Sequence, residues 1–396
     1  MSTAKTTLGY CTNVHAGATL RETRANLQTH AVRVKELFSP EQPMGIGLWL
    51  SARAAQELVA QQGVAEFGEW LAERGLVPFT MNGFPYGDFH QQVVKHRVYQ
   101  PTWWEPARLA YTRQLADILH EILPPGVEGS ISTLPIAWGT PCPDLAQTQQ
   151  AAEQLRELAR YLHALEERTG RLIHVCLEPE PGCVFSFADD AVSFFQWQLF
   201  RGEDVELVRR HIRICHDVCH AAVMFEDQEE VLRKYRDAGI EVGKIQVSAA
   251  LRMDLDGLPL GSPSVGPAAA YGQLRQFVEE RYLHQTMVDG GAFYEDLPLA
   301  LAAAGDATAG EWRVHFHIPI FQRKLGLLES TQEQIVQCLE AAREFSTCPH
   351  YEVETYAWGV LPPEHRPTEL AAGIAEEMRW FADLVRKVDQ QQRGES

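Results

Sequence analysis

The chain has 396 residues, which is enough to bury a large core either as one elaborated barrel or as two ordinary domains. Its 53 acidic residues outnumber its 35 basic residues, and the formal net charge of −18 repels polyanions and anionic membrane surfaces. No run of Lys or Arg offsets this charge. Nucleic acid is therefore excluded as an expected partner.

The sequence shows no apolar stretch of signal-peptide length at its N-terminus and no segment long and apolar enough to span a membrane. We therefore expect a cytoplasmic protein with no direct membrane span. The eight cysteines are too dilute in a chain of this length for a disulfide framework, so we expect mostly reduced, buried thiols.

Strand-like and helix-like segments alternate along the chain, which is typical of a parallel α/β fold. The expected strands are residues 8–13, 44–51, 76–84, 130–139, 172–180, 213–218, 244–251, 313–319 and 351–358. Clear helical segments cover residues 19–38, 105–122, 144–168 and 368–390. Because no Ser/Gly-rich or charged linker interrupts the pattern, residues 1–396 are expected to form a single (β/α)8 TIM-barrel domain, with helix 368–390 closing the ring.

A closed barrel of this type takes eight strands, whereas nine candidates are present. The segment 313–319 follows the longest irregular stretch, about residues 252–312, and is the expected peripheral strand. We expect residues 252–312 to be an insertion between the seventh and eighth strands that covers the barrel mouth. Residues 271–287 within it are expected to be helical.

Acidic and histidine side chains occur at the ends of four consecutive strand candidates. These residues are Glu178, Asp217 with His220, His315 with His317, and Glu354. A parallel barrel brings its strand ends to one rim, so we expect these groups to meet around a divalent metal ion. Oxygen and imidazole donors suit Mn, Zn, Fe, Co or Mg better than a soft-metal site.

Each of these motifs has an ordinary structural alternative. Glu178, or Glu180 after it, is equally suited to capping a turn or pairing with an Arg. The spacing Asp217-x-x-His220 is common by chance and gains weight only because it follows the Glu178 strand. One of the two histidines at 315 and 317 has the alternative of a core position bonded to a backbone carbonyl.

Two glutamates lie on the same face of the last strand, Glu352 and Glu354. A carboxylate inside a barrel is costly without a cation, so Glu354, nearer the rim, is expected to bind the metal. Glu352 is expected to pair with an internal base or solvent at the other end.

Other polar residues near predicted strand ends are expected substrate contacts. Gln246 is assigned either to the metal or to substrate, since an amide oxygen is a weaker ligand than a carboxylate. The remaining candidates are Asn13, His15, Asn82, Trp138 and Arg252. The sequence has no G-x-x-x-x-G-K-[ST], no G-x-G-x-x-G after a strand and no G-x-S-x-G, which excludes the commonest nucleotide-phosphate and serine-hydrolase sites.

This order of motifs resembles the xylose isomerase-like TIM-barrel superfamily of sugar isomerases, epimerases, inosose dehydratases and metal-dependent endonucleases. The resemblance implies metal ligands at Glu178, Asp217 and Glu354 and a companion histidine at His220, whereas Gln246 stands where that pattern has His or Asp. More narrowly, LGYCTNVHAG, LEPEPGC, CHDVCHAAV and VHFHIPIF are similar to the EboE family of metabolite-traffic proteins. That resemblance implies secondary-metabolite processing or export beside a prenyltransferase-like membrane partner.

Three functions are compatible with these residues. The first is a metal-dependent sugar isomerase or epimerase acting on a polyhydroxylated small molecule, with Glu178 and Glu354 as ligands that double as base and acid and His220 orienting substrate. The second is metal-assisted phosphoester hydrolysis, in which His315 and His317 supply an extra ion site. The third is a non-catalytic, metabolite-binding barrel in an export-linked complex. About one ion per chain favours isomerisation, and two or three favour hydrolysis.

Overall fold

The structure, a computed structural model, describes residues 6–303 and 307–394 and contains an eight-stranded parallel barrel. Its strands are β1 Thr7–Tyr10, β2 Met44–Leu48, β3 Leu76–Asn82, β4 Gly129–Thr133, β5 Ile173–Leu177, β6 Ile212–Asp217, β7 Val242–Val247 and β14 His350–Val353. They pair in the order β1-β14-β7-β6-β5-β4-β3-β2. A parallel bridge between Cys11 and Gly47 joins the two ends of this order, so the predicted (β/α)8 TIM-barrel fold is confirmed.

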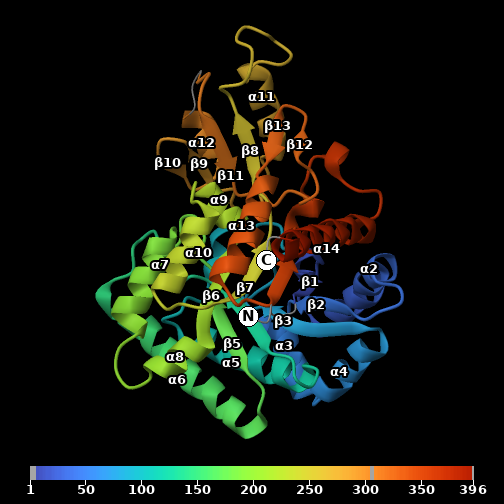
Figure 1. Cartoon of the computed structure of the whole chain (residues 1–396), viewed down its shortest axis with the longest axis vertical. Coiled ribbons are helices and arrows are strands. Elements are labelled where there is room, and N and C mark those ends of the chain that lie inside the picture. The colour runs from blue at the N-terminus through green and yellow to red at the C-terminus, as the bar shows by residue number, and fades with distance from the viewer. Residues whose placement is uncertain (1–5, 304–306, 395–396) are drawn as a thin grey trace.

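Helices surround the barrel and bury its outer face (Figure 1). They are α1 Leu20–Asn26, α2 Val32–Phe38, α3 Ala52–Ala60, α4 Val64–Glu73, α5 Pro106–Ile122, α6 Leu145–Thr169, α7 Ala188–Phe194, α8 Val205–His211, α9 Val218–Val223, α10 Gln228–Asp237, α13 Gln332–Phe345 and α14 Leu370–Gly394. Their ends follow the sequence. The Asp144 side chain accepts a hydrogen bond from the Gln147 amide at the start of α6, and Gly170, at φ 70°, ends that helix.

The barrel interior is polar at its centre. Lys244 on β7 and Glu352 on β14 form an ion pair of 2.6 Å between Nζ and Oε2, and both side chains are fully buried. Gly47 on β2, across the barrel interior, makes room for this pair, because a methyl group there would lie 1.3 Å from Glu352 Oε1. Lys244 Nζ also lies 3.2 Å from Ser132 Oγ. Glu352 thus has the internal basic partner that the sequence predicted.

A second, antiparallel sheet lies between β7 and β14 in the sequence and stands above the barrel in Figure 1. Its strands are β8 Leu251–Asp254, β9 Thr286–Val288, β10 Ala292–Tyr294, β11 Glu311–Val314, β12 Lys324–Leu325 and β13 Leu328–Ser330, in the order β10-β9-β11-β8-β13-β12. Two short helices accompany it, α11 Pro267–Leu274 and α12 Leu297–Ala303. We call residues 251–330 the insertion.

The insertion is larger and more ordered into strands than the sequence indicated. The predicted range of 252–312 stops before β12 and β13, and its residues 304–306 lie outside the described part of the chain. The segment at 313–319 belongs to the second sheet through β11, as expected for a peripheral strand. The predicted helix at 271–287 is wrong beyond residue 277, because residues 286–288 pair with β10 and β11 as strand β9.

The C-terminal helix predicted at 368–390 is α14, which packs on α2 and β1. Among the described residues, none of the helices combines the length and the apolar character that crossing a lipid bilayer requires.

Candidate metal centre

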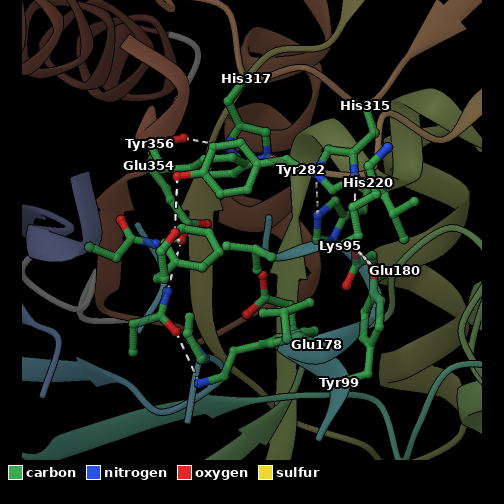
Figure 2. Close-up of a pocket in the computed structure, with 18 residues that line it drawn as sticks. Lys95, Tyr99, Glu178, Glu180, His220, Tyr282, His315, His317, Glu354 and Tyr356 are labelled. Atoms are coloured by element: carbon green, nitrogen blue, oxygen red, sulfur yellow. Dashed lines mark hydrogen bonds and ion pairs between the residues drawn. The ribbon is translucent and has the colours of Figure 1, made fainter. Parts of the chain in front are cut away.

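A pocket opens at the C-terminal ends of the barrel strands, and the insertion contributes part of its wall. Figure 2 shows that the acidic and histidine side chains point into it. The barrel contributes Asn13, Asn82, Glu178, Glu180, His220, Glu354 and Tyr356, whereas Tyr282, Leu283, His315 and His317 come from the insertion. The loop between β3 and α5 contributes Phe84, Pro85, Phe89, Val94, Lys95, Val98 and Tyr99.

Three carboxylates meet on the floor of this pocket. Glu178 directly follows β5, Asp217 ends β6, and Glu354 directly follows β14. One oxygen atom of each lies within 4.8 Å of the others, and all three residues are buried. The structure therefore brings together these three predicted metal ligands from three separate strands.

Neighbouring side chains occupy one oxygen of two carboxylates and leave the other free. Glu354 Oε1 accepts hydrogen bonds from Asn13 Nδ2 at 2.7 Å and Asn82 Nδ2 at 2.8 Å. Asp217 Oδ1 accepts hydrogen bonds from Ser248 Oγ at 2.7 Å and the His220 amide at 3.0 Å. Asp217 Oδ2 and Glu178 Oε2 are buried without a hydrogen-bond partner among the described residues. Buried carboxylate oxygens of this kind call for a cation or a proton.

Burial and repulsion make the two glutamates of this group hard to ionise without a cation, whereas the neighbouring imidazoles hold the pKa of Asp217 below its usual range. Burial, and then the charge of Asp217, raise the pKa of Glu354 to about 8. Burial raises the pKa of Glu178 well above its ordinary value, with Glu354 and Asp217 adding to the effect. A divalent ion bound among the three would remove that repulsion.

Three imidazoles lie beside the carboxylates. His220 stands in the first turn of α9, because the Asp217 carboxylate caps that helix through the His220 amide. His315 and His317 lie just after the end of β11, and not on a strand as their alternating spacing predicted. The amide of His315 still donates to the Gln285 carbonyl at 2.8 Å, and the extended backbone directs both rings into the pocket.

The hydrogen bonds of the three rings define which nitrogen carries the proton. Each Nδ1 faces a carbonyl oxygen, which only accepts: His220 that of Pro179 at 2.9 Å, His317 that of Glu354 at 2.5 Å, and His315 the Gln285 side-chain oxygen at 2.8 Å. Each Nδ1 therefore donates, and each Nε2 presents a lone pair in the neutral ring. Burial lowers the pKa of His317 to about 4 and that of His315 well below its usual range, so both rings are neutral at pH 7.

The Nε2 atom of His315 lies close to the Nε2 atoms of both other rings. His315 Nε2 lies 3.2 Å from His220 Nε2 and 3.3 Å from His317 Nε2. Two unprotonated nitrogens cannot share a hydrogen bond, so this arrangement is unfavourable without a cation between them. A tetrahedral ion with metal–nitrogen bonds of about 2.0–2.1 Å holds its nitrogen ligands about 3.3 Å apart. The imidazoles therefore fit a zinc-like ion.

Asp217 belongs to both donor sets. Its Oδ2 lies 3.8 Å from His220 Nε2 and 3.9 Å from His317 Nε2, and it also faces Glu178 and Glu354. The centre thus offers an Asp217–His220–His317 position and a three-carboxylate position, and Asp217 belongs to both. Shared carboxylates of this kind occur where two ions lie about 3.5–4 Å apart.

A hydrogen-bond network behind His315 was missed by the sequence analysis. Gln285 accepts from His315 through its side-chain oxygen, and its Nε2 donates to Glu180 Oε1 at 2.9 Å. Tyr99 donates to the same Glu180 oxygen at 2.7 Å. These contacts fix the orientation of the His315 ring. Gln285 belongs to no recognisable sequence motif. Ser248, which donates a hydrogen bond to Asp217, could have been found, because the polar residues 244, 246 and 248 alternate along and just after β7.

Besides Asp217, which is buried beside the lining, four of the predicted substrate or metal residues lie outside the pocket lining. His15 contacts the Tyr10 hydroxyl at 3.0 Å and stacks on His30. Trp138 packs beside Tyr99, with ring centroids 5.0 Å apart. Arg252 points along the second sheet, where it pairs with Glu311, Glu329 and Asp254. These assignments had depended on proximity to a strand end, and these three side chains turn to other partners.

Gln246 is the fourth such residue. It lies inside the barrel between the Lys244 level and the rim, in register with Asp217 and Glu352 on the neighbouring strands. Its side chain is fully buried, and neither amide atom has a hydrogen-bond partner among the described residues. The imidazoles of the insertion take the place beside Asp217 for which Gln246 had been considered.

Among the comparisons with known proteins, only the one with solved structures finds similar proteins. No protein-family model matches the chain, and no curated protein matches it. The probable 3-DHS dehydratase AsbF from Bacillus anthracis is 12% identical, with 95% of this chain and 98% of that chain covered and a TM-score of 0.48. The IolI protein with a bound zinc atom is 11% identical, with 96% and 99% covered and a TM-score of 0.47. The 3-keto-D-glucoside 4-epimerase YcjR from E. coli is 17% identical, with 75% and 96% covered and a TM-score of 0.38.

By their names, two of these three structures are a probable dehydratase and an epimerase, and the third holds zinc. What this chain does rests on the side chains of its own pocket.

Proposed function

We propose that this protein is a divalent-metal-dependent isomerase or epimerase of a small hydroxycarbonyl compound. The observation that carries the proposal is the convergence of Glu178, Asp217 and Glu354 with three imidazole lone pairs on the floor of one pocket. A bound divalent cation supplies a Lewis acid that stabilises negative charge developing on substrate oxygens. His220, assigned from the sequence to substrate orientation, is better placed among the metal-binding residues.

The two glutamates are suited to moving a proton. Glu354 is held by Asn13 and Asn82 through one oxygen, which leaves the other free to face the pocket. In the metal-free protein burial raises the pKa of Glu354 to about 8, so this carboxyl group can hold a proton near neutral pH before a cation binds. Glu178 lies across the same floor with one oxygen unpartnered among the described residues. One carboxylate can therefore remove a proton beside a carbonyl while the other returns it.

The test combines metal content with solvent exchange. Purified protein reconstituted with Mn²⁺ or Zn²⁺ is analysed for bound metal, then incubated in deuterated water with a panel of hydroxyketones and followed by NMR. We expect retained metal and deuterium incorporation at the carbon beside the carbonyl. Glu178→Gln and Asp217→Asn should lose metal, whereas Glu229→Gln, an exposed carboxylate on α10, should behave as the parent. Unchanged metal content in the first two variants would end the proposal.

The shared Asp217 favours a second candidate, metal-assisted hydrolysis of a phosphoester, because it gives the centre two adjacent donor sets. Two or more ions per chain, together with release of phosphate from a phosphoester panel, would support hydrolysis over isomerisation. About one ion per chain and no phosphate release would support isomerisation.

Membership in the EboE family, a prenyltransferase-like membrane partner and the non-catalytic metabolite-binding role stay predictions, because no finding tests them. A small-molecule metabolite as the ligand is part of the proposal.

A further inference from the structure

The pocket above the metal-binding residues has a polar floor and an aromatic wall. Phe89, Tyr282 and Tyr356 pack against one another, with ring centroids 5.0 to 5.3 Å apart. The ring of Tyr356 also lies 4.6 Å from the ring of His317. The aromatic wall, which we define as Phe89, Tyr282 and Tyr356, thus reaches down to the imidazole group, as Figure 2 shows for the two tyrosines.

Tyr282 presents its ring rather than a free hydroxyl group, whereas the Tyr356 hydroxyl lies beside the metal-binding histidines. Tyr282 donates its hydroxyl hydrogen to the Phe89 carbonyl at 3.2 Å, and the Tyr356 hydroxyl lies 3.4 Å from His315 Nε2. Other apolar side chains line the same pocket, namely Val94, Val98, Leu283, Pro85 and the aromatic Phe84. A ligand portion far from the floor therefore meets apolar surface and ring faces.

The wall has little to offer an anionic ligand. Among the described residues that line the pocket, Lys95 is the only lysine or arginine. Its ammonium group is paired with the Asp296 carboxylate, so its charge is already compensated. A phosphate or carboxylate group placed beside the aromatic wall would lose its hydration without gaining a cationic partner.

We infer that the substrate of this site is an uncharged molecule that carries a flat aromatic ring beside its hydroxycarbonyl group. The inference rests on the proposed function, since the hydroxycarbonyl end is assigned to the metal-binding floor. The ring occupies the space against Phe89, Tyr282 and Tyr356, where offset and edge-to-face contacts are available. Simple sugars offer this wall only their C–H faces, and sugar phosphates add an anion that finds no free cationic partner beside it among the described lining residues.

Binding of matched probes to the metal-replete protein tests the inference. Isothermal titration compares 2-hydroxyacetophenone, which has the ring, with hydroxyacetone, which lacks it, and with dihydroxyacetone phosphate, which replaces it by an anion. We expect 2-hydroxyacetophenone to bind at least about tenfold more tightly than hydroxyacetone, in line with the contacts that one buried ring makes. Tighter binding of dihydroxyacetone phosphate, or equal binding of the first two, would overturn the inference.

A variant pair locates the effect. Phe89→Leu keeps an apolar side chain and should reduce the preference for the ring by several-fold while metal content stays unchanged. Phe187→Leu, at an exposed phenylalanine before α7, should keep the full preference. An unchanged preference in Phe89→Leu would remove the aromatic wall as its cause and overturn the inference.

The two proposals fail in different ways. If the protein retains no cation, the proposed function falls. If the cation is retained but the ring gives no advantage, only the inference about the substrate falls.

Discussion

Replacing Glu354 by Gln should stabilise the metal-free protein, although it damages the metal centre. Burial and the nearby charges of Asp217 and Glu352 raise the pKa of Glu354 to about 8, against an ordinary value of 4.5. Between pH 4.5 and about 8, the Glu354 carboxyl group therefore keeps its proton in the folded protein but loses it in the unfolded chain. Stability is present in full at low pH and falls as pH rises from about 4.5 to about 8. At pH 7 the loss is about 3 kcal/mol, from about 1.4 kcal/mol for each of about 2.5 pH units.

The glutamine side chain removes this loss and keeps the local contacts. Its amide oxygen still accepts the hydrogen bonds that Asn13 and Asn82 donate to Glu354 Oε1. Urea unfolding of chelator-treated protein should give nearly equal stabilities for parent and Glu354→Gln at pH 5. At pH 7 the variant should be more stable by about 3 kcal/mol.

Glu352→Gln is the matched control, two residues earlier on the same inward face of β14. It leaves the fully buried Lys244 ammonium without its partner at 2.6 Å. We expect it to destabilise the protein at both pH values by about 3 kcal/mol or more. A gain from Glu354→Gln that is the same at pH 5 and pH 7 would refute the reasoning, because packing rather than charge would then explain it.

The affinity for metal should rise with pH, opposite to the stability of the metal-free protein, because both depend on the ionisation of Glu354. Below pH 8 the Glu354 carboxyl must lose its proton to bind a cation, whereas His317, with a pKa lowered to about 4, is already neutral. The apparent affinity for Mn²⁺, followed by electron paramagnetic resonance, should therefore keep rising between pH 6 and pH 8. An affinity that levels off by pH 6 would contradict the role given to Glu354.

Two further substitutions test the supports of the site. Gly47→Ala should destabilise the protein by about 3 kcal/mol or more in urea unfolding, because its methyl group would displace Glu352. Gly87→Ala, where nothing lies within 4 Å, is its control and should leave the unfolding midpoint unchanged. Ser248→Ala removes the hydrogen bond of 2.7 Å to Asp217 and should weaken metal binding about tenfold by titration calorimetry, with the fold unaffected by circular dichroism. Unchanged affinity would show that Ser248 does not orient the carboxylate.

Periodicity in the sequence predicted the barrel and its acidic rim, because parallel strands place their last residues at one mouth. This periodicity located Glu178, Asp217 and Glu354 at the rim. It also predicted the different roles of Glu352, inside the barrel, and Glu354, at the rim. The convergence of His220 with His315 and His317 could not be predicted, because it depends on how the second sheet sits over the barrel. The prediction of a helix at 271–287 was wrong beyond residue 277 for the same reason, because residues 286–288 pair with β10 and β11 in the second sheet.

Arg252 and Trp138 show where a prediction based only on proximity to a strand end is wrong. Both follow or precede apolar runs, yet one pairs with three carboxylates of the second sheet and the other packs on Tyr99. The direction of a side chain after the last strand residue depends on the loop, and nothing in these loops marked it in advance.

Two imidazoles of the centre are carried by the insertion, whereas the carboxylates are carried by the barrel. An ion bound by ligands from the barrel and from the insertion would cross-link the two sheets. Changes in the insertion that move β11, and with it His315 and His317, would therefore alter the metal ligands as well as the cover of the pocket.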